Sequence, residues 1–167
     1  AFLGMLLKDI ENRIKTESDL VQSEARLSLH LENTPLAAIS WDRDFRCVQW
    51  NKAAEKIFGY TRDEAIGRHA VGLIVDDGLK NEVEKVFQSL LNLKGGEHNV
   101  NENVTKDGRR LICDWYNTPI TNERGETVGV VSLAEDVTAQ RRAQDEIQFK
   151  NMLLMAQQEA SVDGILS

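Results

Sequence analysis

Two turn sequences in the second half of the chain constrain its fold more than any other feature. Lys106-Asp107-Gly108-Arg109 and Asn122-Glu123-Arg124-Gly125 carry the Asn, Asp and Gly residues that favour tight turns. They separate three segments, near 97–105, 109–119 and 127–137, in which β-branched and aromatic residues recur. Tight turns join antiparallel neighbours, so the sequence predicts three consecutive antiparallel strands.

The first half of the chain predicts two more strands and a long helix. Short apolar segments at 37–41 and 47–51 flank the turn Asp42-Arg43-Asp44. Apolar residues of 78–91 then recur at helical spacing, at Leu79, Val83, Val86, Phe87 and Leu90. We therefore expect an α+β fold, a five-stranded antiparallel sheet with helices inserted between strands two and three.

Charged segments at both ends predict helices that flank this sheet. Residues 10–33 form a predicted helical linker whose apolar seam is imperfect, with Ile10, Ile14, Val21, Leu27 and Leu31. Residues 139–160 form a predicted C-terminal helix with Ile147 and Leu154 on its apolar side.

The two ends also resemble each other when Asp9 is aligned with Asp136. This self-match is typical of a tandem array of domains. Residues 1–9 would then be the last strand of a preceding domain or the start of the linker, 34–138 a complete domain, and 161–167 the opening of a following domain. The alternative is that two flanking amphipathic helices agree by chance.

Composition excludes several classes of function. The net charge of −7 argues against a nucleic-acid partner, which requires clustered Lys and Arg. No apolar run approaches the ~20 residues that cross a bilayer, so we expect no membrane contact within this segment. The chain's two cysteines make neither a disulfide framework nor a zinc site, and a cytoplasmic location is expected.

The sequence carries no signature of catalysis. It has no nucleophile elbow, no phosphate-binding glycine loop, no metal-binding helix motif and no kinase signature. Its three histidines have no companions at metal-ligand spacing, so no metal site is predicted. We expect a protein segment that is not an enzyme.

Strand periodicity assigns the faces of the fourth and fifth strands. Successive side chains alternate between faces, so the two sets on each strand can be separated. One face receives Leu111, Cys113, Trp115, Val130, Ser132 and Ala134, and the other receives Ile112, Asp114, Tyr116, Val131, Leu133 and Glu135. Both faces are partly apolar, and an uncovered apolar face is costly. The N-terminal helix or a partner subunit should cover the outer face, which predicts a homodimer through the flanking helices and the outer sheet face.

Four signatures in one order resemble the PAS (sensor box) family over roughly residues 25 to 145. They are Val48-Gln49-Trp50-Asn51, Thr61-Arg62-Asp63-Glu64, Lys106-Asp107-Gly108-Arg109 and Asp136-Val137-Thr138. The resemblance implies a sensing and dimerising module of a multi-PAS bacterial-type signalling protein, such as a two-component system. Its partners would be neighbouring PAS domains and an output domain outside this chain, a histidine kinase or a cyclic-dinucleotide enzyme.

The resemblance also implies a small cavity between the concave face of the sheet and the inserted helices. The residues it places there are Ile39, Trp41, Phe58, Phe87, Asn103, Cys113, Trp115, Ser132 and Ala134. Compared with the flavin-binding photosensory branch, the chain lacks the reactive-cysteine stretch Asn-Cys-Arg-Phe-Leu-Gln and retains only Asn103. Cys113 replaces the second flavin-binding amide and Ala134 the signalling glutamine, so blue-light adduct chemistry is not expected.

The cofactor is left open by the sequence, with no bound cofactor preferred over flavin or haem. A haem would need an axial ligand, and His69 stands just upstream of the long helix, where a surface histidine is the better interpretation. The resemblance further implies that Asp136 and Thr138 couple the sheet to the C-terminal helix. Two functions follow: a sensor of a ligand, cofactor state or partner, or a ligand-free structural spacer whose cavity Trp41 and Trp115 fill.

Overall fold

The computed structural model describes residues 2–92 and 97–165. In chain order the elements are α1 (Phe2–Asn33), β1 (Ala37–Asp42), β2 (Cys47–Trp50), α2 (Lys52–Phe58), α3 (Arg62–Ala65), the 3-10 turn η1 (Asp77–Leu79), α4 (Lys80–Asn92), β3 (Glu97–Val104), β4 (Arg110–Thr121), β5 (Thr127–Asp136) and α5 (Thr138–Ile165). The predicted α+β class and the order of its elements are confirmed.

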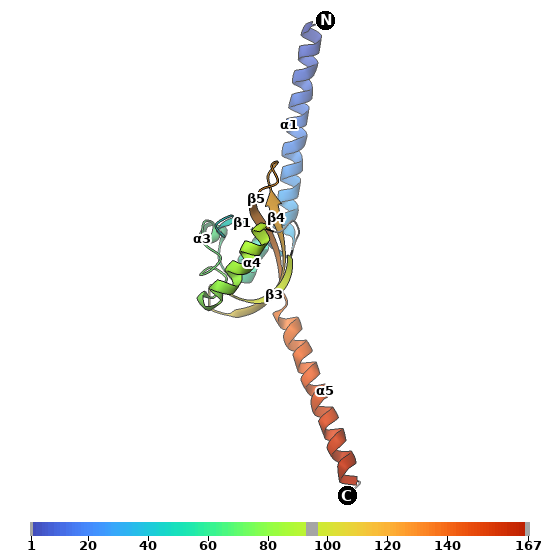
Figure 1. Ribbon diagram of the computed structural model, residues 1–167. Helices are drawn as coiled ribbons and strands as arrows, with labels where there is room; N and C mark the ends of the chain where they lie inside the picture. The colour runs from blue at the N-terminus through green and yellow to red at the C-terminus, as the bar shows by residue number, and fades with distance from the viewer. Residues whose placement is uncertain (1, 93–96, 166–167) are drawn as a thin grey trace.

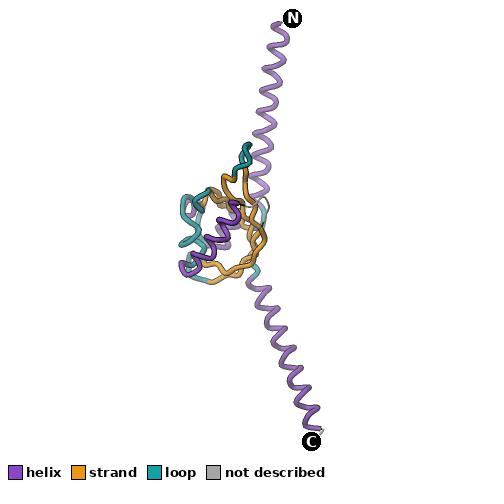
Figure 2. Tube along the Cα trace, viewed as in Figure 1, coloured by secondary structure: helices purple, strands orange, loops and turns teal. Residues whose placement is uncertain are grey.

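The five strands form one antiparallel sheet in the order β2-β1-β5-β4-β3. The last strand, β5, therefore lies at the centre, between β1 and β4. The helices between β2 and β3 lie on one side of the sheet, with α4 across its opening (Figure 1). The tube view shows the curved sheet with α4 packed against it (Figure 2).

Local capping explains where the short helices begin and end. Asn51 is the N-cap of α2 and accepts a hydrogen bond from the N–H of Ala54, and Gly59 ends the helix with φ of 80°. Thr61 and Glu64 form a reciprocal capping box at the start of α3. These caps fix the chain path between β2 and α4.

The alternation predicted for β4 and β5 is confirmed. Cys113, Trp115, Ser132 and Ala134 are buried on the concave face. The outer face exposes apolar side chains, at Val100, Tyr116 and Ile120. Within the described residues of a single chain, this outer face is thus only partly covered.

Both long helices project from the sheet domain, in opposite directions (Figure 1). α1 buries none of its residues. Among the described residues, none of the helices contains an apolar stretch long enough to cross a membrane.

The structure describes both ends of the chain as helix. Residues 2–9 are the first turns of α1, which continues without a break into the charged segment expected as the helical linker. The division of the chain between neighbouring domains of a tandem array stays a prediction. α5 likewise continues to Ile165, so residues 161–165 extend the helix predicted to end at 160, and 166–167 lie outside the described residues.

Candidate ligand cavity and helix junctions

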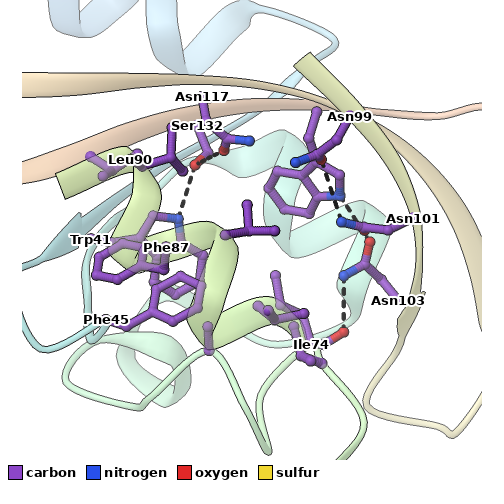
Figure 3. Close-up of a pocket in the computed structure, with 16 residues that line it drawn as sticks. Trp41, Phe45, Ile74, Phe87, Leu90, Asn99, Asn101, Asn103, Asn117 and Ser132 are labelled. Carbon is purple, nitrogen blue, oxygen red and sulfur yellow. Dashed lines mark hydrogen bonds between the residues drawn. The ribbon is translucent and has the colours of Figure 1, made fainter. Parts of the chain in front are cut away.

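A small cavity of about 50 Å³ lies between the concave face of the sheet and α4. Figure 3 shows its two walls, one aromatic and one carrying a row of asparagines. The lining residues are Trp41, Phe45, Ala70, Ile74, Val75, Val83, Val86, Phe87, Leu90, Asn99, Asn101, Asn103, Trp115, Asn117, Val130 and Ser132.

The aromatic wall is built by three rings from three different elements. The rings of Phe45 and Phe87 stack at 3.9 Å between centroids with 13° between their planes. Trp41 meets Phe45 edge-on at 5.2 Å. Phe45 can reach this position because its backbone adopts a left-handed conformation, with φ of 58°, in the turn after β1.

The polar wall is cross-linked by side-chain hydrogen bonds. Trp115 donates its indole N–H to Asn103 Oδ1 at 2.9 Å, and Asn103 Nδ2 donates to the carbonyl of Ile74 at 3.1 Å. Trp41 donates its indole N–H to Ser132 Oγ at 3.1 Å. Both indoles are therefore held in place by neutral partners on neighbouring strands.

Ser132 extends this network to the rim of the cavity. Its hydroxyl donates to Asn117 Oδ1 at 2.6 Å while accepting from Trp41. The cavity thus touches the central strand β5 through a side chain that is itself bonded to β1 and β4.

Five of the nine pocket residues expected from the resemblance line the cavity: Trp41, Phe87, Asn103, Trp115 and Ser132. The other four, Ile39, Phe58, Cys113 and Ala134, belong to the solid core beside it. The reason is that α2 packs against this end of the sheet. Phe58 lies between Trp50 and Trp115, with ring centroids 5.6 Å and 6.1 Å away, and fills the space.

The resemblance did not predict the other three asparagines that line the cavity, or Phe45 of its aromatic wall. Asn99 and Asn101 precede Asn103 at alternate positions of β3, so period two was the signal that could have found them. Asn117 follows Trp115 on β4 by the same rule. Phe45 carries no such signal, because its place depends on a left-handed turn.

The cavity does not fit a flavin or a haem in this arrangement. Pockets for drug-sized ligands usually measure about 300–1,000 Å³, and this one measures about 50 Å³. His69 lies outside the lining, and its Nδ1 accepts a hydrogen bond from the N–H of Val71 at 3.1 Å. Within residues 2–92 and 97–165, no group of three or more His, Cys, Asp or Glu side chains is gathered for a metal ion.

The two cysteines are free and buried on the inner side of the sheet domain. Burial raises the pKa of the Cys47 thiol to about 11. Burial, and then the nearby charge of Asp136, raises the pKa of Cys113 to about 12. Both thiols are therefore protonated near neutral pH and unsuited to thiolate chemistry.

A compact hydrogen-bonded junction joins the sheet to α5. Asp136 Oδ1 accepts a hydrogen bond from the backbone N–H of Thr138 at 3.0 Å and another from the Thr138 hydroxyl. Thr138 Oγ1 in turn accepts from the N–H of Ile112 at 2.8 Å. Asp136 thus binds a free N–H at the helix start, as a residue before a helix can.

A second junction joins the sheet to α1 through Asn51, which is 4% exposed. Asn51 Nδ2 donates to the carbonyls of Leu31 at 2.7 Å and Leu36 at 3.0 Å. Its Oδ1 accepts from the N–H groups of Ala38 and Ala54. One side chain therefore connects the end of α1, the start of β1 and the start of α2.

Comparisons with known proteins agree with this fold. A relative, the biofilm dispersion protein BdlA of Pseudomonas aeruginosa, is 28% identical over 134 residues, which is 77% of this chain and 32% of that protein. The chain thus spans about a third of that relative's length.

Two solved structures share the fold. A PAS domain from Colwellia psychrerythraea superposes with a TM-score of 0.64 at 22% identity, covering 72% of this chain and 98% of that one. The PAS domain of BvgS from Bordetella pertussis gives a TM-score of 0.58 at 16% identity, covering 78% and 98%. The family model described as PAS fold matches residues 25–137, and the chain therefore belongs to the PAS family.

Proposed function

We propose that this chain is a sensory PAS module that detects a small ligand or partner and relays the event through its flanking helices in a homodimer. One observation carries the proposal. Ser132 lines the cavity, and Asp136, four positions along the same strand, accepts hydrogen bonds from the first residue of α5. A shift of β5 at the cavity would therefore act directly on the start of α5.

The exposed apolar residues of the helices support the homodimer. Leu3, Leu7, Ile10, Ile14 and Val21 are exposed and follow one another along α1 at spacings of three, four and seven residues, close to a heptad repeat. Glu17 and Glu24 occupy positions of the same stripe. α5 adds Ile147 and a cluster of large apolar residues around Met152 and Leu154, all exposed in a single chain. A partner helix would bury both sets.

A groove beside α1 supports participation of the outer sheet face. It measures about 350 Å³ and lies between Leu27 and Leu31 of α1 and Ala38 and Val131 of the sheet. Its size suits apolar side chains from a second copy. We therefore propose an interface that combines the helices with the outer face.

The difference in length between this chain and the Pseudomonas protein supports the proposal that the chain is one domain of a longer protein. The chain spans 32% of that relative, which is named for biofilm dispersion. We propose that this PAS domain likewise acts within a longer signalling protein, beside further PAS domains and an output domain. The module itself would bind and relay, and catalysis would reside in the output domain.

A second function, the ligand-free structural spacer, has its own support. Trp41 and Trp115 both line the cavity, and both indole N–H groups already have partners. A cavity of about 50 Å³ holds only one or two water molecules, each of which takes about 30 Å³. In a spacer, a movement of one flanking helix would be transmitted to the other without any ligand in the cavity.

A distance measurement tests the relay that both functions require. A spin label at Gln148→Cys on α5, in a chain with Cys47 and Cys113 replaced by Ala, gives the distance between the two α5 helices of a dimer. Asp136→Ala should shift or broaden this distance, whereas Asp145→Ala, on the exposed surface of α5, should leave it unchanged. An identical distance distribution in Asp136→Ala would remove the relay from the proposal.

A further inference from the structure

The asparagine row leaves one buried hydrogen-bond acceptor unpaired. Asn101 Oδ1 is buried and has no partner among the described residues. Its Nδ2 makes only a long contact of 3.4 Å to Asn99 Oδ1. Buried polar atoms are normally paired, and one that is not costs the full desolvation of that atom. A bound donor group that reached this oxygen would satisfy it.

The whole lining of the cavity is uncharged. It consists of aliphatic and aromatic side chains, four asparagines and one serine, with no Asp, Glu, Lys, Arg or His. Moving an ion into such surroundings without an opposite charge is strongly unfavourable. This lining therefore favours a neutral occupant over an ion.

The rest of the wall indicates what else the occupant carries. The side-chain amide of Asn99 stands beside Asn101, and Asn117 lies farther along the lining, beside Ser132 (Figure 3). Trp41 lies across the cavity from the asparagine row (Figure 3), and Trp115 also lines the cavity. Planar groups pack well on such rings.

From these observations we propose that the cavity binds a small, planar, uncharged amide or lactam. Its N–H donates to Asn101 Oδ1, its carbonyl accepts from the neighbouring asparagine amides, and its plane lies against the indoles. This inference rests on the proposed sensory function and gives it a ligand class. A ring exceeds the volume of about 50 Å³, so binding must move Phe87 and Leu90 of α4 outward.

The probe that tests this ligand class is 2-pyridone, a flat lactam with one N–H and one carbonyl. N-methyl-2-pyridone is its matched control, since it has the same ring and carbonyl without the donor. In NMR titrations of the ¹⁵N-labelled chain, 2-pyridone should shift the side-chain amide signals of Asn99 and Asn101 and the backbone signals of α4. The N-methyl compound should bind at least about tenfold more weakly, the loss expected for one hydrogen bond.

Protein variants sharpen the result. Asn101→Leu removes the acceptor while preserving size, and it should weaken 2-pyridone about tenfold. Asn81→Leu, on the exposed side of α4, should bind as the original chain does. A thermal melt of each variant confirms that it is folded before titration.

Three outcomes would overturn the ligand class. They are equal binding of the two pyridones, undiminished binding by Asn101→Leu, or preferential binding of the cation benzylamine. Preferential binding of benzylamine would indicate that the Glu97 carboxylate binds the cation, since Glu97 lies four residues before Asn101 on β3. If 2-pyridone fails while Asp136→Ala still changes the α5 distance, the ligand class falls and the relay stands. If 2-pyridone binds as expected without changing that distance, the ligand class stands and the relay falls.

Discussion

Thr138 Oγ1 accepts a hydrogen bond from the backbone N–H of Ile112 at 2.8 Å, which ties the first residue of α5 to the neighbouring strand β4. Thr138→Val keeps the shape of the side chain but leaves this N–H without its partner. We expect the free energy of unfolding to fall by about 1–2 kcal/mol and the α5 distance distribution in the labelled dimer to broaden.

Thr138→Ser is the matched control, because it restores the hydroxyl. Urea denaturation followed by tryptophan fluorescence measures the first effect, and spin-label distances measure the second. If Thr138→Val and Thr138→Ser behave alike in both, the hydroxyl does not set the position of α5.

The Asn51 junction predicts a specific response of α1. In Asn51→Asp an oxygen replaces Nδ2 and faces the carbonyls of Leu31 and Leu36, so two hydrogen bonds become two repulsive contacts. A loss of about 2–4 kcal/mol of stability is expected, because the site is buried. Hydrogen exchange should also accelerate at the C-terminal turns of α1.

Asn33→Asp provides the comparison at the same end of α1. Asn33 Nδ2 donates to the carbonyl of Leu29 at 2.8 Å, but the residue is exposed, and water can replace the bond. Its substitution should cost well under about 1 kcal/mol. Similar losses in the two variants would mean that Asn51 does not couple α1 to the sheet.

The sheet could be predicted from the sequence because its rules are local. Turn residues located the hairpins, and period two assigned Cys113 and Trp115 to the inner face, where both are buried. The same rule would have extended the pocket from Asn103 to Asn101 and Asn99. The resemblance supplied single positions, whereas the cavity uses the whole alternating row.

Other parts of the site depend on contacts between distant segments. Phe58 was expected in the cavity, yet it fills the core between Trp50 and Trp115, because α2 packs closely on β1. Phe45 lies in the wall because its backbone is left-handed, and no local sequence pattern predicts that conformation. The volume of the cavity depends on how these rings pack, and no sequence pattern predicts that volume.

The α1 seam predicts that a single substitution tightens the proposed dimer. Glu17 occupies a seam position between Ile14 and Val21, so two Glu17 side chains would face each other in a parallel pair. Glu17→Leu removes that repulsion and completes the stripe, and the dimer dissociation constant should fall at least about tenfold. Asp19→Leu adds the same side chain away from the seam. Sedimentation velocity that finds equal effects for both would exclude α1 as the interface.

The buried thiols predict slow chemistry in the folded chain. Cys47 and Cys113 are each 0% exposed, so neither should react with a disulfide reagent at pH 8 until the chain unfolds. An exposed control thiol, Gln148→Cys, should react at once. Rapid reaction of either native cysteine would show that the core opens readily.

The same thiols predict a loss of stability in alkali. Below about pH 8 both are protonated in the folded and the unfolded chain, so they add little pH dependence. As the pH rises through 9 the unfolded thiols ionise, while the folded pKa values of about 11 for Cys47 and about 12 for Cys113 keep the native thiols protonated. The unfolded chain then binds fewer protons, and the free energy of unfolding decreases as pH rises. A chain with both cysteines replaced by Ala should lose less stability between pH 9 and 11 in urea titrations.

Gly129 of β5 leaves no room for a side chain against β1. A Cβ added there would lie against the carbonyl oxygen of Trp41, closer than van der Waals contact allows. Gly129→Ala must therefore push the two strands apart beside the cavity, and we expect a loss of about 1–3 kcal/mol. Gly4→Ala, where nothing lies within 4 Å, should not destabilise the chain, because Ala favours a helix over Gly. Urea denaturation followed by tryptophan fluorescence compares the two, and equal midpoints would mean that β5 can shift beside Trp41 at little cost.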